Sequence, residues 1–159
     1  MNPVYNILES IRQELSSNVL MNTVSFGDLT EVDLNKTTMF PLSHIIMEQS
    51  TIRSSVLLFD LRIIIADVVD ISNKKESSDE FYGNDNLQDV LNSMYVVAQR
   101  AAASLYRGDK YRDLFRIEDD PILEPFMDRF QNLLAGWEMT MTITVPNTIS
   151  IDDGQGNCS

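Results

Sequence analysis

Residues 136–146, GWEMTMTITVP, alternate between large apolar and polar side chains, and this pattern constrains the fold more than any other. Side chains of an extended strand point alternately to opposite faces, so the segment predicts a strand with one buried and one polar face. The glycine and proline at its ends mark its limits, because proline cannot donate a ladder hydrogen bond. The expected inner row is Trp137, Met139, Met141, Ile143 and Val145, and the expected outer row is Glu138, Thr140, Thr142 and Thr144.

Four further segments are expected to be strands. Residues 56–69 alternate in the same way and should pair with residues 42–49 as a long antiparallel hairpin joined around residues 50–55. Residues 22–26 predict a short strand. Residues 122–130 predict another, whose early part should lie at a sheet edge or bulge because it contains Pro125.

Two segments show the apolar spacing of helices. Residues 3–15 follow Asn2, a favoured N-cap residue, and carry an apolar stripe at helical spacing. A second helix is expected to begin at Asn84 or Asn86 and to end at Gly108. The sequence therefore predicts an α+β fold, in which two helices pack on one face of an antiparallel sheet of about five strands.

The segments between these elements lack periodicity. Residues 29–39 and 70–83 predict long loops, and residues 109–120 predict an irregular connection. Residues 1–147 are expected to form a single domain, since a chain of 159 residues buries roughly 70% of its unfolded surface in one core. Residues 148–159 predict a C-terminal tail that is flexible or ordered by a partner.

Composition excludes several classes of protein. The chain has 12 Lys and Arg against 24 Asp and Glu, so its formal charge of −12 disfavours specific binding to a phosphate backbone. The single cysteine, Cys158, excludes an internal disulfide framework and a multi-cysteine metal site. The sequence has neither a secretory signal pattern nor an apolar run of about 20 residues. These features predict a soluble protein that is made in a cytoplasm and has no membrane contact.

The candidate catalytic and metal-binding residues favour structural explanations. His44 is the only histidine, so a hydrolytic triad or zinc site lacks its other members. Asp60 and Asp67 are seven residues apart on a strand, which places them on opposite faces rather than in an acid–base pair. Asp119–Asp120 and residues 152–154 do not match a calcium loop and predict solvated turns. We therefore expect no enzymatic activity, no catalytic, cofactor-binding or metal-binding residues, and no cofactor.

The polar face of the main strand is a candidate interface with other subunits or partners. Polar rows with β-branched residues and exposed aromatic residues occur where subunits of a ring pair with each other. Simple solvent exposure explains the same pattern equally well. The candidate interface residues are Arg53, Arg62, Phe81, Tyr82, Glu138, Thr140, Thr142 and Thr144.

Several short motifs carry a resemblance to a known group of proteins. They are FGDL at 26–29, FYGNDN at 81–86, EPF at 124–126 with DRF at 128–130, and LAGWE at 134–138 leading into TITVPN at 142–147. In these motifs the chain resembles a virion protein of tailed bacteriophages that infect Bacteroidetes, the crAss-like group among them. In the order of its elements it is similar to the tail terminator or tail completion family.

This resemblance implies a structural virion protein in the neck or tail, made in the cytoplasm of the host bacterium. It implies a homo-oligomeric ring of six or twelve copies at the head–tail junction, in contact with adjacent neck and tail proteins. DNA would pass through this ring without specific binding. Another ring of the neck or tail barrel, such as a head-completion adaptor or stopper, is an alternative, and a small cytoplasmic binding protein is an alternative from a different class.

Overall fold

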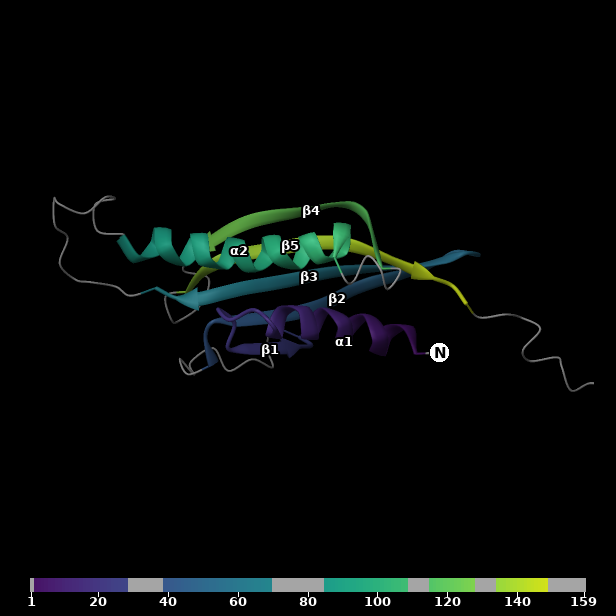
Figure 1. Ribbon diagram of the computed structural model, residues 1–159, viewed down its shortest axis with the longest axis horizontal. Coiled ribbons are helices and arrows are strands. Elements are labelled where there is room, and N and C mark those ends of the chain that lie inside the picture. Colours follow the sequence, from purple (N-terminus) through teal and green to yellow (C-terminus); the bar gives the residue numbers. More distant parts are fainter. Residues whose placement is uncertain (1, 29–38, 70–84, 109–114, 128–133, 149–159) are drawn as a thin grey trace, which may run out of the picture.

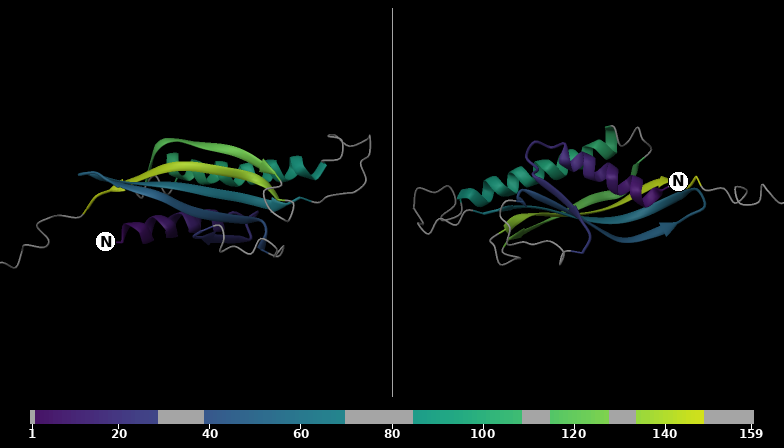
Figure 2. Two further views of the ribbon diagram at one scale, coloured as in Figure 1. Left: turned by 180° about the vertical axis from the view of Figure 1, so that it is seen from behind. Right: turned by 90° about the horizontal axis from the view of Figure 1, so that it is seen from below.

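The computed structural model describes residues 2–28, 39–69, 85–108, 115–127 and 134–148. Within these residues the chain forms two helices and one sheet of five strands, which is an α+β arrangement. Both helices lie over the same face of the sheet, as predicted, and the right-hand view of Figure 2 shows them together on one side of the strands. Neither described helix combines the length and apolar character needed to cross a bilayer.

The strand order across the sheet differs from the order along the chain. From one edge to the other it is β1 (Thr23–Phe26), β2 (Leu42–Ile52), β3 (Val56–Val68), β5 (Leu134–Pro146) and β4 (Arg116–Met127) (Figure 1). All neighbours are antiparallel except β1 and β2, which run parallel. The expectation of a purely antiparallel sheet was therefore wrong at β1. The connection from β1 to β2, residues 27–41, is long enough to return the chain in the same direction.

The central strands β3 and β5 carry the predicted alternation. They pair from Val56 opposite Pro146 to Val68 opposite Leu134. Met139, Met141, Ile143 and Val145 are buried on the helix-covered face, and Trp137 packs against the same core. Gly136 lies so close to β3 that an added Cβ would stand 1.9 Å from the carbonyl oxygen of Ile65. The glycine at this position thus permits the close approach of the two strands.

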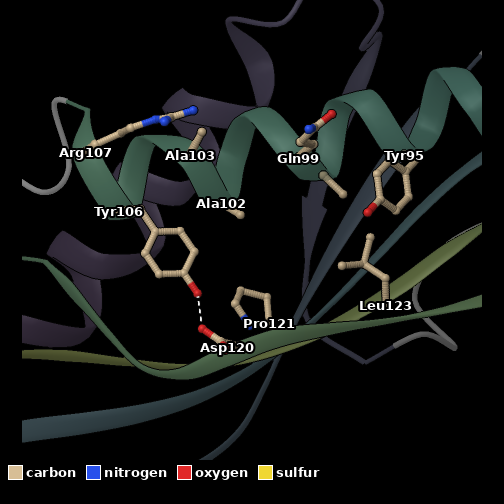
Figure 3. Close-up of a pocket in the computed structure, with 10 residues that line it drawn as sticks. Tyr95, Gln99, Ala102, Ala103, Tyr106, Arg107, Asp120, Pro121 and Leu123 are labelled. Atoms are coloured by element: carbon tan, nitrogen blue, oxygen red, sulfur yellow. Dashed lines mark hydrogen bonds between the residues drawn. The ribbon is translucent and has the colours of Figure 1, made fainter.

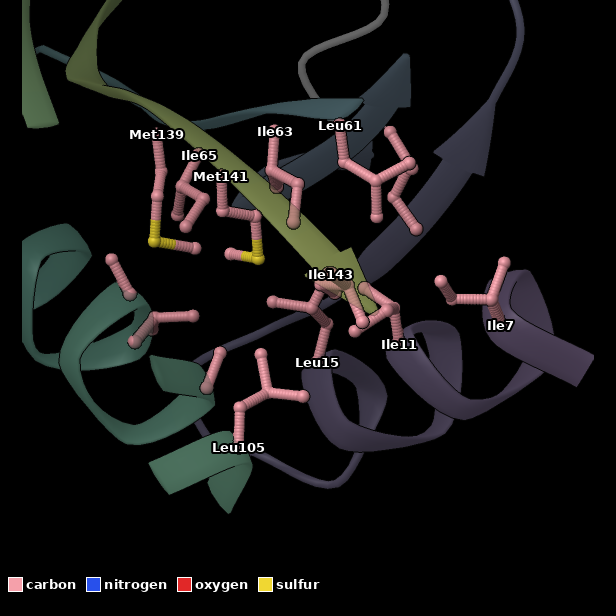
Figure 4. Packing of buried hydrophobic residues seen from close by; sticks show 14 of the residues in the cluster. Ile7, Ile11, Leu15, Leu61, Ile63, Ile65, Leu105, Met139, Met141 and Ile143 are labelled. Atoms are coloured by element: carbon pink, nitrogen blue, oxygen red, sulfur yellow. The ribbon is translucent and has the colours of Figure 1, made fainter. Parts of the chain in front are cut away.

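The helices cover the core with the stripes that the sequence predicted. In α1 (Pro3–Ser16), Ile7, Ile11 and Leu15 are buried (Figure 4). Asn2 occupies the N-cap position, although its side chain makes no capping hydrogen bond. In α2 (Asp85–Arg107) the buried stripe reaches from Val90 to Leu105, and the alanines within it allow the helix to approach the sheet.

The edge strand β4 begins earlier than predicted. Residues 116–120, expected to be irregular, pair with β5 across two register shifts between Ile117 and Ile122. The sequence there has no alternation, and contact with β5 rather than local propensity holds it extended. Pro125 lies on this edge strand, as predicted. The loop expected at 29–39 lies outside the described residues except for its last residue, and so do the loop expected at 70–83 and the tail from residue 149.

Candidate interaction surfaces

His44 joins β2 to the edge strand β1. Its ring is buried, with 1% of its surface exposed. Nε2 lies 2.9 Å from the carbonyl oxygen of Gly27, to which it donates because a carbonyl oxygen can only accept, and Nδ1 lies 2.7 Å from Ser25 Oγ. No sequence pattern indicates the Ser25 contact, because the contact depends on the parallel register that places Ser25 opposite His44. These contacts confirm the structural role expected for this histidine.

The candidate carboxylates are separated from each other. Asp60 accepts a hydrogen bond of 2.6 Å from Thr142 on one face of the sheet. Asp67, on the other face, accepts from the backbone N–H of Val68 at 2.8 Å, and its partial burial raises its pKa. Among the described residues no group of three or more His, Cys, Asp or Glu side chains could hold a metal ion.

The predicted outer row of β5 lies on the face that neither helix covers. Its residues differ in exposure: Thr140 is exposed, Thr142 and Glu138 are half-buried, and Thr144 is buried. Arg62 Nη1 donates to Glu138 at 3.3 Å, and its Nε lies 3.0 Å from Glu48 as an ion pair without hydrogen-bond geometry. Much of this candidate interface is therefore engaged within the chain.

The remaining candidate interface residues lie apart from that row. Arg53 is exposed at the turn between β2 and β3 and forms an ion pair of 3.4 Å with Glu118 of β4. Phe81 and Tyr82 lie outside the described residues.

The two edges of the sheet expose large apolar side chains. Phe26 on β1 is 52% exposed, and on β4 Ile122 is 63% and Met127 45% exposed. β4 also carries Pro121 and Pro125, consecutive acidic residues at 118–120 and two register shifts, which all hinder the addition of another strand. A neighbour at this edge would therefore meet side chains rather than a free backbone ladder.

A cleft of about 360 Å³ separates α2 from β4 (Figure 3). Ala102 of α2 faces Pro121 across it, and Ala103 also lines it. At one end the hydroxyl of Tyr106 donates to Asp120 at 2.5 Å. This hydrogen bond, followed by desolvation and the charge of Asp120, raises the pKa of Tyr106. The cleft is thus apolar along its length and polar at its rim.

The cleft was not expected from the sequence. Its two walls are α2 and the segment of β4 from Asp120 to Leu123, and no local pattern indicated that these two elements meet. At the other end of the cleft Tyr95 packs edge-on against Trp137, with ring centroids 5.2 Å apart. Trp137 in turn donates from Nε1 to the carbonyl oxygen of Leu91 at 2.8 Å, which ties α2 to β5.

A second hollow flanks α1. Its volume is about 450 Å³, and it lies between the polar side of α1 and the end of β5, where Phe115, Val145 and Pro146 line it. Tyr5, which is largely exposed, borders both this hollow and a smaller one toward Phe26. The surface beside α1, near the β1 edge of the sheet, therefore differs in shape and composition from the surface at the β4 edge.

Comparison of the sequence with models of known protein families finds no match, and comparison with curated proteins finds none either.

Proposed function

We propose that this protein is a structural component of the virion of a tailed bacteriophage. In this proposal copies of the chain form a ring at the head–tail junction, similar to a tail terminator or tail completion protein, which joins the neck to the tail and surrounds the DNA passage. The single observation that carries the proposal is the exposure of large apolar side chains at both edges of one sheet, on β1 and on β4.

The two edges support a head-to-tail contact because they are unlike each other. β1 is a strand of four residues beside α1, whereas β4 has 12 residues, two prolines and an adjoining cleft. A contact between two different surfaces repeats around an axis and closes into a ring when the rotation allows it. Since β4 hinders backbone pairing, the subunits would join through side-chain packing.

The charge of the chain fits a passage for DNA. With a formal charge of −12 per copy, a ring repels the phosphate backbone and disfavours adhesion of DNA to its wall. Adjacent neck and tail proteins are the expected partners, and no cofactor is required. A head-completion adaptor or stopper would be a different ring in the same region of the particle.

A small binding protein is the second candidate, and the α2–β4 cleft is the observation that favours it. Its volume of about 360 Å³ falls within the range of ligand pockets, and an apolar wall with a few polar groups at the rim is typical of them. A protein of this kind would act in the host cytoplasm as a monomer and would be missing from particles.

Mass spectrometry of purified phage particles distinguishes the two candidates. If the chain is a neck or tail component, its peptides copurify with the portal and tail proteins at a constant ratio, and antibody labelling places it at the neck or tail. If the chain is found only in the soluble fraction of infected cells, the virion proposal is wrong.

A further inference from the structure

Self-association of this chain has to overcome repulsion between copies. Each copy carries a formal charge of −12, with 24 acidic against 12 basic residues. Two such surfaces repel each other unless cationic groups lie where they meet. The arginines that are not already neutralised within the chain therefore indicate where one copy can approach another.

Most of the described arginines have partners in their own chain. Arg12 pairs with Glu9, Arg53 with Glu118, and Arg62 with Glu48 and Glu138. Arg116 donates to the carbonyl oxygen of Phe115. Arg100 and Arg107 are exposed on α2, and neither forms an ion pair with any part of the chain that the structure describes.

These two arginines lie on the same side of one helix. They are separated by seven residues, which is about two turns and about 10 Å along the helix axis. Ala103 and Tyr106 lie next to them on the outer surface of α2, and Arg107, Ala103 and Tyr106 all line the α2–β4 cleft. Figure 3 shows Tyr106 directed toward Asp120 of β4 and Arg107 leaving the helix in another direction.

From this placement we infer that the outer surface of α2 is a contact surface for a second copy of the chain. The α2 contact surface consists of Arg100, Arg107, Ala103, Tyr106 and the adjoining cleft. The arginines attract the acidic surface of the next copy, while the small side chains and the cleft accept its apolar side chains. This inference rests on the proposed function, because it requires that copies of the chain assemble.

Two variants with the same net charge test the electrostatic part. R100Q/R107Q removes two positive charges from the α2 contact surface, and S54E/Q88E adds two negative charges at exposed positions outside it. Both change the formal charge from −12 to −14. Sedimentation velocity over a concentration series measures assembly, and thermal melts followed by circular dichroism confirm that each variant is folded.

We expect the wild-type chain and S54E/Q88E to assemble over the same concentration range. For R100Q/R107Q we expect the midpoint concentration of assembly to rise on the order of tenfold, as for the loss of close charge contacts at an interface. Folded R100Q/R107Q that assembles like the wild type would overturn the inference while leaving the proposed function intact. If the wild type also stays monomeric at every concentration, both alone and mixed with the neck and tail proteins of the phage, self-assembly itself is absent and both are overturned.

A third variant tests the steric part without changing charge. Ala103 lies on the outer side of α2 and is only half-buried, so a larger side chain there extends into solvent. A103W should therefore fold normally and raise the midpoint concentration of assembly, because the indole would clash with a second copy that packs against this side of α2. Unchanged assembly of A103W would show that this side of α2 faces solvent in the oligomer, against the inference.

Discussion

At the scale of residues, Gly136 is fixed by the close approach of β3. A Cβ at this position would stand 1.9 Å from the carbonyl oxygen of Ile65, far inside van der Waals contact. We expect G136A to lower the free energy of unfolding by roughly 2–4 kcal/mol, since the strands must separate to admit the methyl group. Urea denaturation measures this loss. T140A, at an exposed position of the same strand, serves as the control and should change stability by less than about 1 kcal/mol.

His44 is a second position where one side chain holds two strands together. H44A removes the hydrogen bonds to Ser25 and Gly27 and leaves a cavity in place of a buried ring. The expected loss is roughly 2–4 kcal/mol, and S25A, which removes one hydrogen-bond partner, should lose roughly 1 kcal/mol. Denaturant titration of both variants compares the two losses. Equal stability of H44A and wild type would contradict the structural role of this histidine.

Asp67 makes stability depend on pH. Its pKa in the folded chain is raised by burial, so the folded state binds a proton more tightly than the unfolded state. At neutral pH the ionised, partly buried carboxylate lowers the free energy of unfolding. This destabilisation disappears as the pH falls through the raised pKa and the carboxyl group becomes neutral. D67N keeps an acceptor for the Val68 N–H, so it should be more stable than wild type at neutral pH.

Thermal melts between pH 4 and 8 test this prediction. The advantage of D67N should shrink as the pH falls, because the wild-type carboxyl group then becomes neutral as well. An advantage that grows toward acid pH would show that the charge of Asp67 stabilises the fold.

The residues that were predictable from sequence are those whose burial follows a local period. The inner row of β5 and the stripe of α1 were read from spacing alone, because burial repeats every second residue in a strand and about every third or fourth in a helix. Ser25 was not predictable as the partner of His44, because the contact depends on how distant strands align. Arg100 and Arg107 were not predictable either, since it is the fold that leaves them without an ion-pair partner among the residues that the structure describes.

At the scale of elements, β4 shows that pairing with a neighbouring strand can hold a segment extended where the local sequence has no strand pattern. Residues 116–120 have no alternation, yet they are held against β5, and the cleft wall begins at the end of this stretch with Asp120. The parallel direction of β1 was also missed, because alternation predicts that a segment is extended but not which way its neighbour runs. The antiparallel pairings of β2, β3, β5 and β4 follow from short connections or from matched patterns along the chain.

The protected edge of β4 gives a prediction about aggregation. Pro121 and Pro125 remove two N–H groups from this strand, and Asp119 adds an exposed negative charge. Replacing these three residues with threonine should expose an edge that accepts another strand, and so promote non-specific association. Thioflavin T fluorescence and light scattering at 37 °C measure this effect. A variant that stays as clear as wild type would show that the register shifts alone protect the edge.

At the scale of the whole molecule, the proposed function depends on assembly of several copies of the chain. Both helices lie on one face of the sheet, and the two sheet edges, β1 and β4, expose apolar side chains but differ from each other. On the outer side of α2, two arginines have no ion-pair partner among the described residues. The proposed function uses these surfaces as contacts that repeat around an axis. Sequence patterns predicted the layers, whereas the oligomeric state depends on complementarity between surfaces that no local period encodes.

Native mass spectrometry of the purified chain measures directly whether copies assemble. The proposed function predicts, at micromolar concentration and low salt, a closed oligomer of six or twelve copies of the 18.1 kDa chain, without a ladder of intermediate species. A spectrum that contains only the 18.1 kDa monomer at every concentration, both alone and mixed with the neck and tail proteins of the phage, would contradict it.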